Sequence, residues 1–324
     1  MEKERSAKEY DERMFLPKDL TVEIIIPTLN EELTIRELIE DIRSCILPAK
    51  ISVLVVDGGS TDSTLQICKR GNVKFIVQKE RGKGSAIREA VENSGADIVV
   101  FIDADGTYSF SDLELLLEPL LNNKADIVVG SRMQGKMQKK SISILNTFGN
   151  KLFNKAINFA MKSSLTDCLS GYRALFRSTF NDLVLFSDSF EIEVEMTVEA
   201  LAKGYRVLEV PIKYKPRRDG SNTKLDPIGD GIKIGRTLLF ILMNVNPLKF
   251  FGIFSLGFFV VALWPTAQVL YEKITYGEII SMPAVVLSSL LLIAAALCIA
   301  VGMVSELVVR SRRRLEFLIN KKLT

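Results

Sequence analysis

Residues 98 to 105 read Ile98-Val99-Val100-Phe101-Ile102-Asp103-Ala104-Asp105, in which five apolar side chains are followed at once by two carboxylates. A short, continuous apolar run of this kind is typical of a strand that is buried on both faces of a parallel sheet. The loop that follows such a strand lies at the carboxyl end of the sheet, where α/β folds bind their ligands. We therefore expect Asp103 and Asp105 to lie in a binding site.

Further apolar runs flank this segment, and helical patterns separate them. The predicted strands are Val22 to Ile26, Ile51 to Val56, Val73 to Val77, Ile98 to Ile102 and Ile127 to Val129. The predicted helices are Glu31 to Cys45, Ser63 to Arg70, Gly84 to Ser94 and Ser111 to Asn122. This alternation predicts an α/β fold with a mostly parallel sheet that helices cover on both faces. The loops that start at Pro27, Asp57, Gln78 and Asp103 are then the expected ligand-binding loops.

The C-terminal part of the chain differs in composition from the rest. Phe250 to Tyr271 and Ile279 to Ser305 contain no Asp, Glu, Lys or Arg. Each run is longer than the ~20 apolar residues that cross a bilayer. A buried core helix has the same composition, but here no soluble chain follows for two such helices to pack against. We therefore predict a C-terminal two-helix transmembrane hairpin, with spans at about 250–271 and 280–305.

Basic residues beside the spans predict the orientation, because Lys and Arg are retained on the cytoplasmic side. They are Lys233, Arg236 and Lys249 before the first span, and Arg310, Arg312, Arg313, Arg314, Lys321 and Lys322 after the second. The connecting turn, Glu272 to Glu278, offers only Lys273. The charged N-terminal segment lacks the apolar stretch of a signal peptide. We expect an integral membrane protein whose large N-terminal domain and both termini are cytoplasmic.

These features predict five parts of the chain. A charged segment (residues 1–20) precedes an α/β domain (21–226), an interfacial helix (227–248), the two spans (249–309) and a basic cytoplasmic tail (310–324). The interfacial helix is indicated by Lys233 and Arg236, which lie among Ile and Leu beside the first span. Asn146 to Met161 is a further amphipathic pattern. It fits a helix that packs on the core and a helix at a membrane surface equally well.

The chain contains no histidine, and this excludes several kinds of active site. Ser-His-Asp catalysis, Cys-His catalysis and imidazole metal sites all need that residue. The four cysteines, Cys45, Cys68, Cys168 and Cys298, lack metal-type spacing, and we interpret them as reduced structural thiols. A catalytic base would have to be a carboxylate, a lysine or the substrate itself.

Two acidic loops are the candidates for chemistry. Asp103 and Asp105 offer hard oxygen ligands suited to Mg²⁺ or Mn²⁺, ions that commonly bridge to substrate phosphates. A solvated acidic turn is the alternative, since Asp-Gly pairs are common in turns. The second loop, Asp57-Gly58-Gly59-Ser60-Thr61-Asp62, also ends an apolar strand. Its first aspartate can accept hydrogen bonds from a ribose or a base, and its glycines permit a ligand to approach closely.

The order of the motifs resembles that of inverting family 2 glycosyltransferases, which have the Rossmann-like GT-A fold. The matching motifs are Pro27-Thr28-Leu29-Asn30-Glu31, Val56-Asp57-Gly58-Gly59-Ser60-Thr61-Asp62, Arg81-Gly82-Lys83-Gly84, Asp103-Ala104-Asp105 and Gly130-Ser131-Arg132. Two later motifs are similar to those of polyprenyl-phosphate glycosyltransferases, the group that includes dolichyl-phosphate mannose and glucose synthases. They are Asp167-Cys168-Leu169-Ser170-Gly171-Tyr172-Arg173 and Arg218-Asp219-Gly220-Ser221-Asn222-Thr223-Lys224-Leu225. The resemblance covers about residues 21 to 226.

The resemblance implies a role for each matching residue. The nucleotide sugar would be held by Pro27, Leu29, Glu31, Asp57, Lys83, Asp103, Ala104, Asp105, Arg218 and Lys224, and the metal by Asp103, Asp105 and Thr107. The acceptor phosphate would contact Arg132, Lys139, Lys140 and Arg173. The implied catalytic residues are Asp105, Arg132, Arg218 and Lys224, because Arg and Lys match phosphate charge. Without the motif order, Arg132 and Arg218 would read as ordinary surface charges.

The implied reaction also accounts for the missing histidine. A lipid phosphate is already anionic, so it needs no base before it attacks the anomeric carbon, and the enzyme supplies alignment and charge neutralisation. We expect inverting transfer of a hexose from a nucleotide sugar to dolichyl or polyprenyl phosphate, with Mg²⁺ or Mn²⁺ as cofactor. Membrane lipid is a further expected partner and a homo-oligomer is left open. Nucleic acid is not expected, because the basic residues cluster beside the spans.

Two departures from the mannosyl pattern bear on the substrates. Thr107 stands where mannosyl relatives commonly have a glutamine metal ligand, and this favours UDP-glucose or UDP-N-acetylglucosamine over GDP-mannose as the donor. Ser143 lies near the position of an arginine in those relatives, so Lys139 or Lys140 would take over its contact with the acceptor phosphate. Glu193 and Glu195 are candidates for contacts to the sugar or the acceptor, with an exposed acidic face as the alternative.

Two other functions remain as alternatives. A processive polysaccharide synthase on the same fold would carry a Gln-x-x-Arg-Trp motif, but the single tryptophan, Trp264, lies inside a predicted span. A catalytically inert membrane scaffold would have lost an aspartate of the Asp103/Asp105 pair or the later Arg-Lys loop. The sequence retains both of these features.

Overall fold

The computed structural model describes residues 20–44, 50–135, 144–217, 235–236, 239, 243 and 246–323, with only the backbone described for 144–148 and 312–323. The chain divides into two compact units, Met1–Thr237 and Leu238–Thr324. Several predictions fall outside the described residues: nearly all of the N-terminal segment, most of the interfacial helix, and the side chains of Lys139, Lys140, Arg218 and Lys224.

A seven-stranded mixed sheet forms the centre of the first unit, in the order β3-β2-β1-β4-β6-β5-β7. Its strands are β1 (Thr21–Thr28), β2 (Lys50–Asp57), β3 (Lys74–Val77), β4 (Ile98–Phe101), β5 (Ile127–Ser131), β6 (Arg173–Phe176) and β7 (Val207–Pro211). Strands β1 to β4 run parallel, and β5 is parallel to β7. Only β6 is antiparallel to its neighbours among these strands, so the predicted mostly parallel sheet is confirmed.

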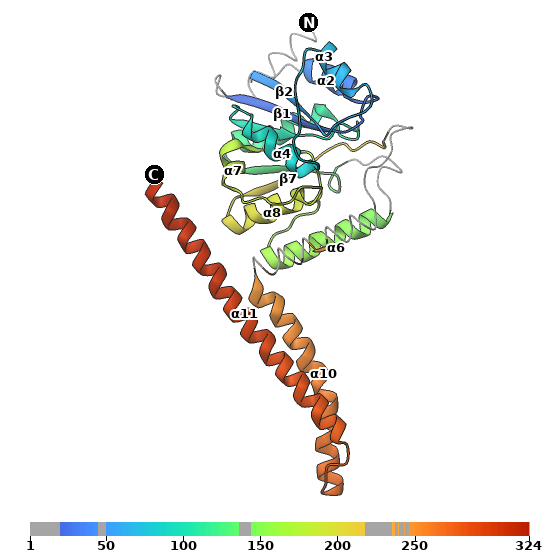
Figure 1. Cartoon of the computed structure of the whole chain (residues 1–324), viewed down its shortest axis with the longest axis vertical. Coiled ribbons are helices and arrows are strands. Elements are labelled where there is room, and N and C mark those ends of the chain that lie inside the picture. Colours follow the sequence, from blue (N-terminus) through green and yellow to red (C-terminus); the bar gives the residue numbers. More distant parts are fainter. Residues whose placement is uncertain are drawn as a thin grey trace. The chain divides into compact units, whose positions relative to one another are not determined.

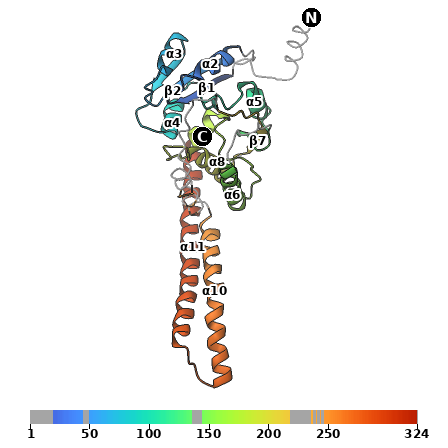
Figure 2. The same cartoon turned by 90° about the vertical axis from the view of Figure 1, so that its right-hand side faces the viewer.

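Helices cover both faces of the sheet (Figure 2), as the alternating pattern predicts. They are α2 (Ile35–Ser44), α3 (Thr64–Arg70), α4 (Lys83–Glu92), the 3₁₀ turn η1 (Phe110–Asp112), α5 (Leu113–Leu121), α6 (Ile144–Met161), α7 (Arg177–Asp182) and α8 (Ile192–Lys203). One apolar core lies between the sheet and α2, α3 and α5. A second core lies between the opposite face and α4, α7 and α8. Strand β4 is buried throughout because its side chains enter both cores.

The register of the parallel strands brings the predicted loops to one edge. Thr28, the last residue of β1, pairs with Asp57, the last residue of β2, and Asp57 pairs with Val77 at the end of β3. Phe101 ends β4 opposite Ile25 of β1. The loops after these four strands therefore emerge together, at the edge where an α/β sheet binds ligands.

The second unit contains a hairpin of two long helices, α10 (Pro247–Tyr276) and α11 (Met282–Leu323), which lie side by side (Figure 1). Ser255 of α10 donates a hydrogen bond to the carbonyl of Ala295 in α11, at 2.8 Å. In the turn, Gly277 adopts φ of 76°, a left-handed conformation that glycine tolerates. The Glu272 carboxylate accepts the N–H groups of Ile280 and Ser281, and so ties the end of one helix to the start of the other.

Both helices are long and apolar enough to cross a membrane. The qualifying segments are Pro247–Tyr276 and Met282–Ser311, which contain 18-residue stretches with mean hydropathies of 1.8 and 2.8. A 30-residue helix is roughly 45 Å long, more than the ~30 Å hydrocarbon core. Most of their surface is exposed rather than packed in a core, and Trp264 is 81% exposed. The predicted hairpin is confirmed, and α11 continues through most of the predicted basic tail.

Candidate active site

A cleft of about 470 Å³ opens at the carboxyl edge of the sheet. Its lining comprises Pro27, Thr28, Leu29, Glu31, Gly58, Gly59, Gln78, Arg81, Gly82, Lys83, Ala86, Asp103, Ala104, Asp105, Ser189, Phe190 and Arg217. The four loops predicted from the strand ends all contribute to it. Of the residues predicted to hold a nucleotide sugar, seven line this cleft: Pro27, Leu29, Glu31, Lys83, Asp103, Ala104 and Asp105.

Asp57 stabilises the loop that follows it, Gly58-Gly59-Ser60. Its carboxylate is completely buried and accepts the backbone N–H groups of Gly59 and Ser60, at 2.9 and 2.8 Å. Gly59 has φ of 88°, which allows the loop to turn over the carboxylate. The structure thus differs from the expected direct contact between Asp57 and a ribose. The backbone of Gly58 and Gly59, rather than the Asp57 side chain, faces the cleft.

Lys83 bridges two carboxylates in the cleft. Its ammonium group contacts Asp103 Oδ1 and lies 2.7 Å from Glu193 Oε1. The Lys83 side chain is only 9% exposed, and Glu193 is 5% exposed. Burial by itself lowers the pKa of Lys83, but the charges of Asp103 and Glu193 outweigh burial and raise that pKa. Lys83 is therefore a fixed positive charge beside Asp103.

Glu193 and Glu195 do not form an exposed acidic face, so that alternative is wrong. Glu193, at the start of α8, is buried against Lys83. Glu195 accepts the backbone N–H groups of Phe186 and Ser187, at 3.0 and 2.8 Å. It thereby holds the segment that leads to Ser189 and Phe190 in the wall of the cleft.

Asp105 is paired with an arginine that the sequence did not single out. Oδ2 of Asp105 accepts Nε and Nη2 of Arg217, at 3.0 and 2.5 Å. Oδ1 accepts the backbone N–H and the hydroxyl of Thr107, at 3.0 and 2.6 Å. Burial alone raises the pKa of Asp105, but the hydrogen bond from Thr107 and the charge of Arg217 hold it below its usual range.

Thr107 is therefore placed to support Asp105. Its side chain is buried, it is not among the residues lining the cleft, and its hydroxyl donates to the carboxylate. The predicted role of Thr107 as a metal ligand does not match this position. Threonine is used here because its hydroxyl and its backbone N–H reach the same carboxylate oxygen.

A short backbone pairing brings Arg217 into the cleft. Tyr108 and Tyr214 form an isolated antiparallel bridge, and Lys215 donates its N–H to the carbonyl of Thr107, at 2.8 Å. The chain after β7 is thus joined to the loop after Asp105. The sequence motif indicated Arg218 and Lys224, and Arg217 could have been noticed only as a second basic residue directly before that motif.

The carboxylates can take part in binding a divalent cation. Among the residues that the structure describes, no three carboxylates or thiols gather to hold a metal by themselves. Mg²⁺, however, is commonly bound by one or two carboxylates together with substrate phosphates. Asp103 is 28% exposed within the cleft and Asp105 lies two residues away. The pair fits an ion that is shared with a bound diphosphate.

Arg132, predicted to contact an acceptor phosphate, forms a two-point ion pair with Asp167. Its Nε and Nη2 each lie 2.7 Å from an oxygen of that carboxylate. The guanidinium also lies over the ring of Tyr214, 5.4 Å from the ring centre. Burial by itself lowers the pKa of Arg132, but the surrounding Tyr108 and Asp167 raise it. Arg132 is thus a permanently charged group held in one orientation.

Three asparagines of α6 hold the loop that carries Asp167. Asn150 donates to Asp167 Oδ1 at 2.8 Å, and Asn154 accepts the N–H of Cys168 at 3.0 Å. Asn158 both donates to and accepts from the backbone of Leu165, at 2.8 Å. Residues four apart share one face of a helix, so these side chains form a ladder along α6. The interpretation of α6 as a core-packing helix is correct for this face.

The prediction that Arg173 contacts an acceptor phosphate requires a correction. Arg173 is completely buried at the start of β6. Its guanidinium donates to the carbonyls of Ser170 and Cys168 and to the hydroxyl of Thr197, at 2.5 to 2.8 Å. These bonds fix the loop before β6, and the side chain has no surface that a substrate could reach.

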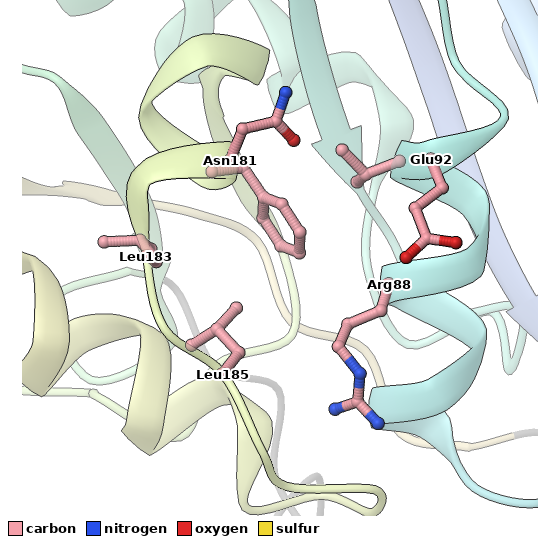
Figure 3. Close-up of a pocket in the computed structure, with 7 residues that line it drawn as sticks. Arg88, Glu92, Asn181, Leu183 and Leu185 are labelled. Carbon is pink, nitrogen blue, oxygen red and sulfur yellow. The ribbon is translucent and has the colours of Figure 1, made fainter. Parts of the chain in front are cut away.

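A second, smaller cavity of about 170 Å³ lies between α4 and the chain around α7. It is lined by Arg88, Val91, Glu92, Phe180, Asn181, Leu183 and Leu185. Figure 3 shows Arg88 and Glu92 on one side, facing Asn181, Leu183 and Leu185 on the other. Arg88 is bound to the carbonyl of Ser187 and the carboxylate of Asp188. The cavity therefore lacks the carboxylate pair that marks the larger cleft.

Comparison with known proteins agrees with this geometry. Residues 23–184 match the family described as glycosyl transferase family 2. The glycosyltransferase AglJ of Haloferax volcanii is 42% identical over 244 residues, which are 75% of this chain and 78% of that protein. A dolichyl-phosphate hexose transferase of the same organism is 30% identical over 68% of this chain and 93% of its own length.

Solved structures show the same fold. Glucosyl-3-phosphoglycerate synthase of Mycobacterium tuberculosis, solved with phosphoglyceric acid, has a TM-score of 0.57 at 23% identity and covers 69% of this chain and 80% of its own. Another structure of that enzyme contains Mn²⁺, UDP-glucose and phosphoglyceric acid, with a TM-score of 0.56 at 22% identity. The predicted GT-A fold and glycosyltransferase activity are confirmed, and the chain belongs to glycosyl transferase family 2.

Proposed function

We propose that this glycosyltransferase moves a hexose from a nucleotide sugar to polyprenyl or dolichyl phosphate, with inversion at the anomeric carbon. The observation that carries the proposal is the cluster of Lys83, Asp103, Asp105 and Arg217 in the main cleft. It alternates cations and carboxylates at the edge of the sheet, and such an arrangement suits a diphosphate that shares a divalent cation with the protein.

The donor side of the cleft supports a nucleotide sugar. The backbone of Gly58 and Gly59 leaves room for a flat ligand to approach, and Leu29 and Glu31 lie beside it. Mg²⁺ or Mn²⁺ held by Asp103 and Asp105 would supply charge to stabilise the departing diphosphate. UDP-glucose or UDP-N-acetylglucosamine is the favoured donor, because Thr107 supports Asp105 from within the fold, whereas mannosyl relatives have glutamine there. Arg218 and Lys224 are proposed to add phosphate contacts.

The acceptor side centres on Arg132. Its two-point bond to Asp167 orients the guanidinium, and such a group matches the oxygens of a phosphate. Lys139 and Lys140, which follow in sequence, are proposed to add charge at the same place. The acceptor class is also supported by the similarity to a dolichyl-phosphate hexose transferase.

The chemistry requires no histidine base. An oxygen of the lipid phosphate forms a bond to the anomeric carbon from one side, while the bond from that carbon to the diphosphate oxygen breaks on the other. The electron pair of the broken bond leaves with the nucleoside diphosphate. Arg132 orients the nucleophile, and Lys83 and Arg217 offset negative charge near the leaving group.

The membrane parts fit this acceptor. The hairpin of α10 and α11 would anchor the enzyme in the bilayer that contains the lipid phosphate. The face of α6 opposite the asparagine ladder exposes Lys151, Leu152, Lys155 and Phe159, a combination typical of helices at a membrane surface. From the basic residues that flank the hairpin we propose that the catalytic unit and both termini are cytoplasmic.

The test is transfer of radiolabelled sugar into organic-extractable lipid. Purified full-length protein would receive polyprenyl phosphate, Mg²⁺ or Mn²⁺, and one of UDP-glucose, UDP-N-acetylglucosamine or GDP-mannose. We expect a single sugar in lipid from one donor, dependent on the metal and abolished by Asp105→Ala. Asp126→Ala, which removes a half-buried carboxylate paired with Arg206 away from the cleft, is the control that should keep activity.

Two outcomes would contradict the proposal. Folded protein that binds nucleotide and yet labels no lipid from any donor would exclude this reaction for these substrates. Products that contain many linked sugars would instead identify a processive synthase.

A further inference from the structure

We propose that Arg217 exchanges between two anions, the Asp105 carboxylate and the diphosphate of the donor, and thereby makes divalent-cation binding and nucleotide binding depend on each other. This inference rests on the proposed nucleotide and metal sites of the cleft. It assigns to Arg217 a role in binding the donor that the motif itself does not assign.

The Asp105 carboxylate has no vacant hydrogen-bond acceptor position. It accepts four hydrogen bonds, two from Thr107 and two from Arg217, and its side chain is only 6% exposed. A carboxylate has about four lone-pair sites. A cation can therefore bind Asp105 only where an existing donor leaves.

Arg217 is the donor that can leave the Asp105 carboxylate. Thr107 lies two residues from Asp105 on the same loop, so its backbone N–H moves with the carboxylate. Arg217 is 29% exposed and lines the cleft. It lies beyond the bridge between Tyr108 and Tyr214, which fixes the chain before it. Its guanidinium can turn from a carboxylate to a diphosphate, because both present paired oxygens to the same planar fork.

Lys83 is held differently and does not share this freedom. It contacts Asp103 and Glu193 together and is almost completely buried. Gly171 packs so closely that a Cβ added there would lie 2.8 Å from the Lys83 ammonium. The cleft therefore combines one fixed cation, Lys83, with one exchangeable cation, Arg217.

The consequence is positive coupling between two ligands. A divalent cation that binds alone must displace Arg217 from Asp105 before the diphosphate is present to receive the arginine. A diphosphate that binds alone must draw Arg217 away and leave a buried carboxylate uncompensated. When both bind, the cation neutralises the Asp105 carboxylate that Arg217 has left, and the diphosphate gives Arg217 a new partner. By linkage, each then raises the affinity of the other by the same factor.

The experiment measures Mn²⁺ binding by electron paramagnetic resonance, with the purified full-length chain and with no sugar transfer required. Mn²⁺ is titrated alone, with UDP and with GDP, for wild type, Arg217→Gln and Arg206→Gln. Arg206 is the matched control, because it is also an arginine paired with a carboxylate, that of Asp126. This pair lies at the start of β5, away from the carboxyl edge of the sheet where the cleft opens. We expect the nucleotide that binds to tighten Mn²⁺ binding to wild type by about 5- to 100-fold.

Arg217→Gln should bind Mn²⁺ at least several-fold more tightly than wild type in the absence of nucleotide. Its coupling factor should be smaller than that of wild type but stay above one, because the ion shared with the diphosphate still couples the two ligands directly. Arg206→Gln should behave as wild type. Unchanged or weaker Mn²⁺ affinity in Arg217→Gln, or an unchanged coupling factor, would overturn the inference. If neither nucleotide promotes Mn²⁺ binding to wild type, that result would also contradict the proposed nucleotide-sugar site in the cleft. If the coupling is found but no lipid is labelled, only the proposed acceptor is wrong.

Discussion

Arg132 and Asp167 are joined at two points, with Nε and Nη2 of the arginine each 2.7 Å from the carboxylate. The backbone N–H of Arg132 also donates to Asp167, at 2.9 Å, so that three bonds connect the end of β5 to the loop before β6. Asp167 is completely buried. This pair therefore serves the stability of the fold and the orientation of the proposed acceptor arginine together.

Replacement of Asp167 by asparagine should test both roles. Asp167→Asn keeps the size of the side chain but leaves Arg132 without its counter-charge, and loss of one partner of a buried pair costs about 3–5 kcal/mol. We expect a lower unfolding temperature and a higher KM for the lipid phosphate, with nucleotide affinity unchanged. Thermal unfolding, acceptor kinetics and nucleotide titration measure the three quantities. A nucleotide affinity that falls in parallel would contradict a role confined to the acceptor side.

Lowering the pH should weaken the ion pair between Arg132 and Asp167. Burial alone raises the pKa of Asp167, but the charge and hydrogen bonds of Arg132 lower it below the ordinary value of about 4. Because the folded-state pKa is depressed, the stability from this pair is fully present above pH of about 4 and is lost as pH falls through the folded-state pKa. Unfolding temperatures of wild type should decline over that range. Asp167→Asn should lack this part of the decline.

The asparagine ladder should influence the acceptor site from a distance. Asn150→Leu removes the hydrogen bond to Asp167 and should cost about 1.5–3 kcal/mol, the usual contribution of a hydrogen bond to a charged group. We expect the KM for lipid phosphate to rise while the KM for the donor stays constant. Ser164→Ala, at an exposed residue shortly after α6 and outside the proposed membrane-surface face, is the control for general damage to this region. Equal effects on both KM values would mean that Asn150 only stabilises the fold.

Gly171 should be intolerant of a side chain. A Cβ at this position would lie 2.7 Å from Asp103 Oδ2 and 2.8 Å from the Lys83 ammonium, so Gly171→Ala must move that ion pair. Overpacking of this kind typically costs about 1–3 kcal/mol. We expect weaker binding of nucleotide with Mn²⁺, measured by calorimetry. Gly95→Ala is the control, since a Cβ there meets nothing within 4 Å. Wild-type affinity in Gly171→Ala would show that the pair is free to shift.

The five strands recognised in the sequence all form, and the loops after four of them, β1 to β4, meet at one cleft. Strands β6 and β7 were missed, because β6 begins with an arginine and β7 contains a glutamate and ends in proline. Both are stabilised by neighbours far away in sequence. Arg173 of β6 donates to the hydroxyl of Thr197, 24 residues away, and Glu209 of β7 accepts the N–H of Asp167, 42 residues away. A short strand pattern cannot reveal partners of this kind.

By itself the sequence determined the fold class, the C-terminal hairpin of two long apolar helices and the loops that form the cleft, because apolar patterns and strand-end positions are local properties. Only the tertiary structure decided which side chain each carboxylate contacts. It paired Asp105 with Arg217, Asp103 with Lys83 and Glu193, and directed Asp57 and Thr107 to support the loops. The physical reason is that buried charges must find partners in three dimensions, and those partners lie up to 112 residues apart along the chain.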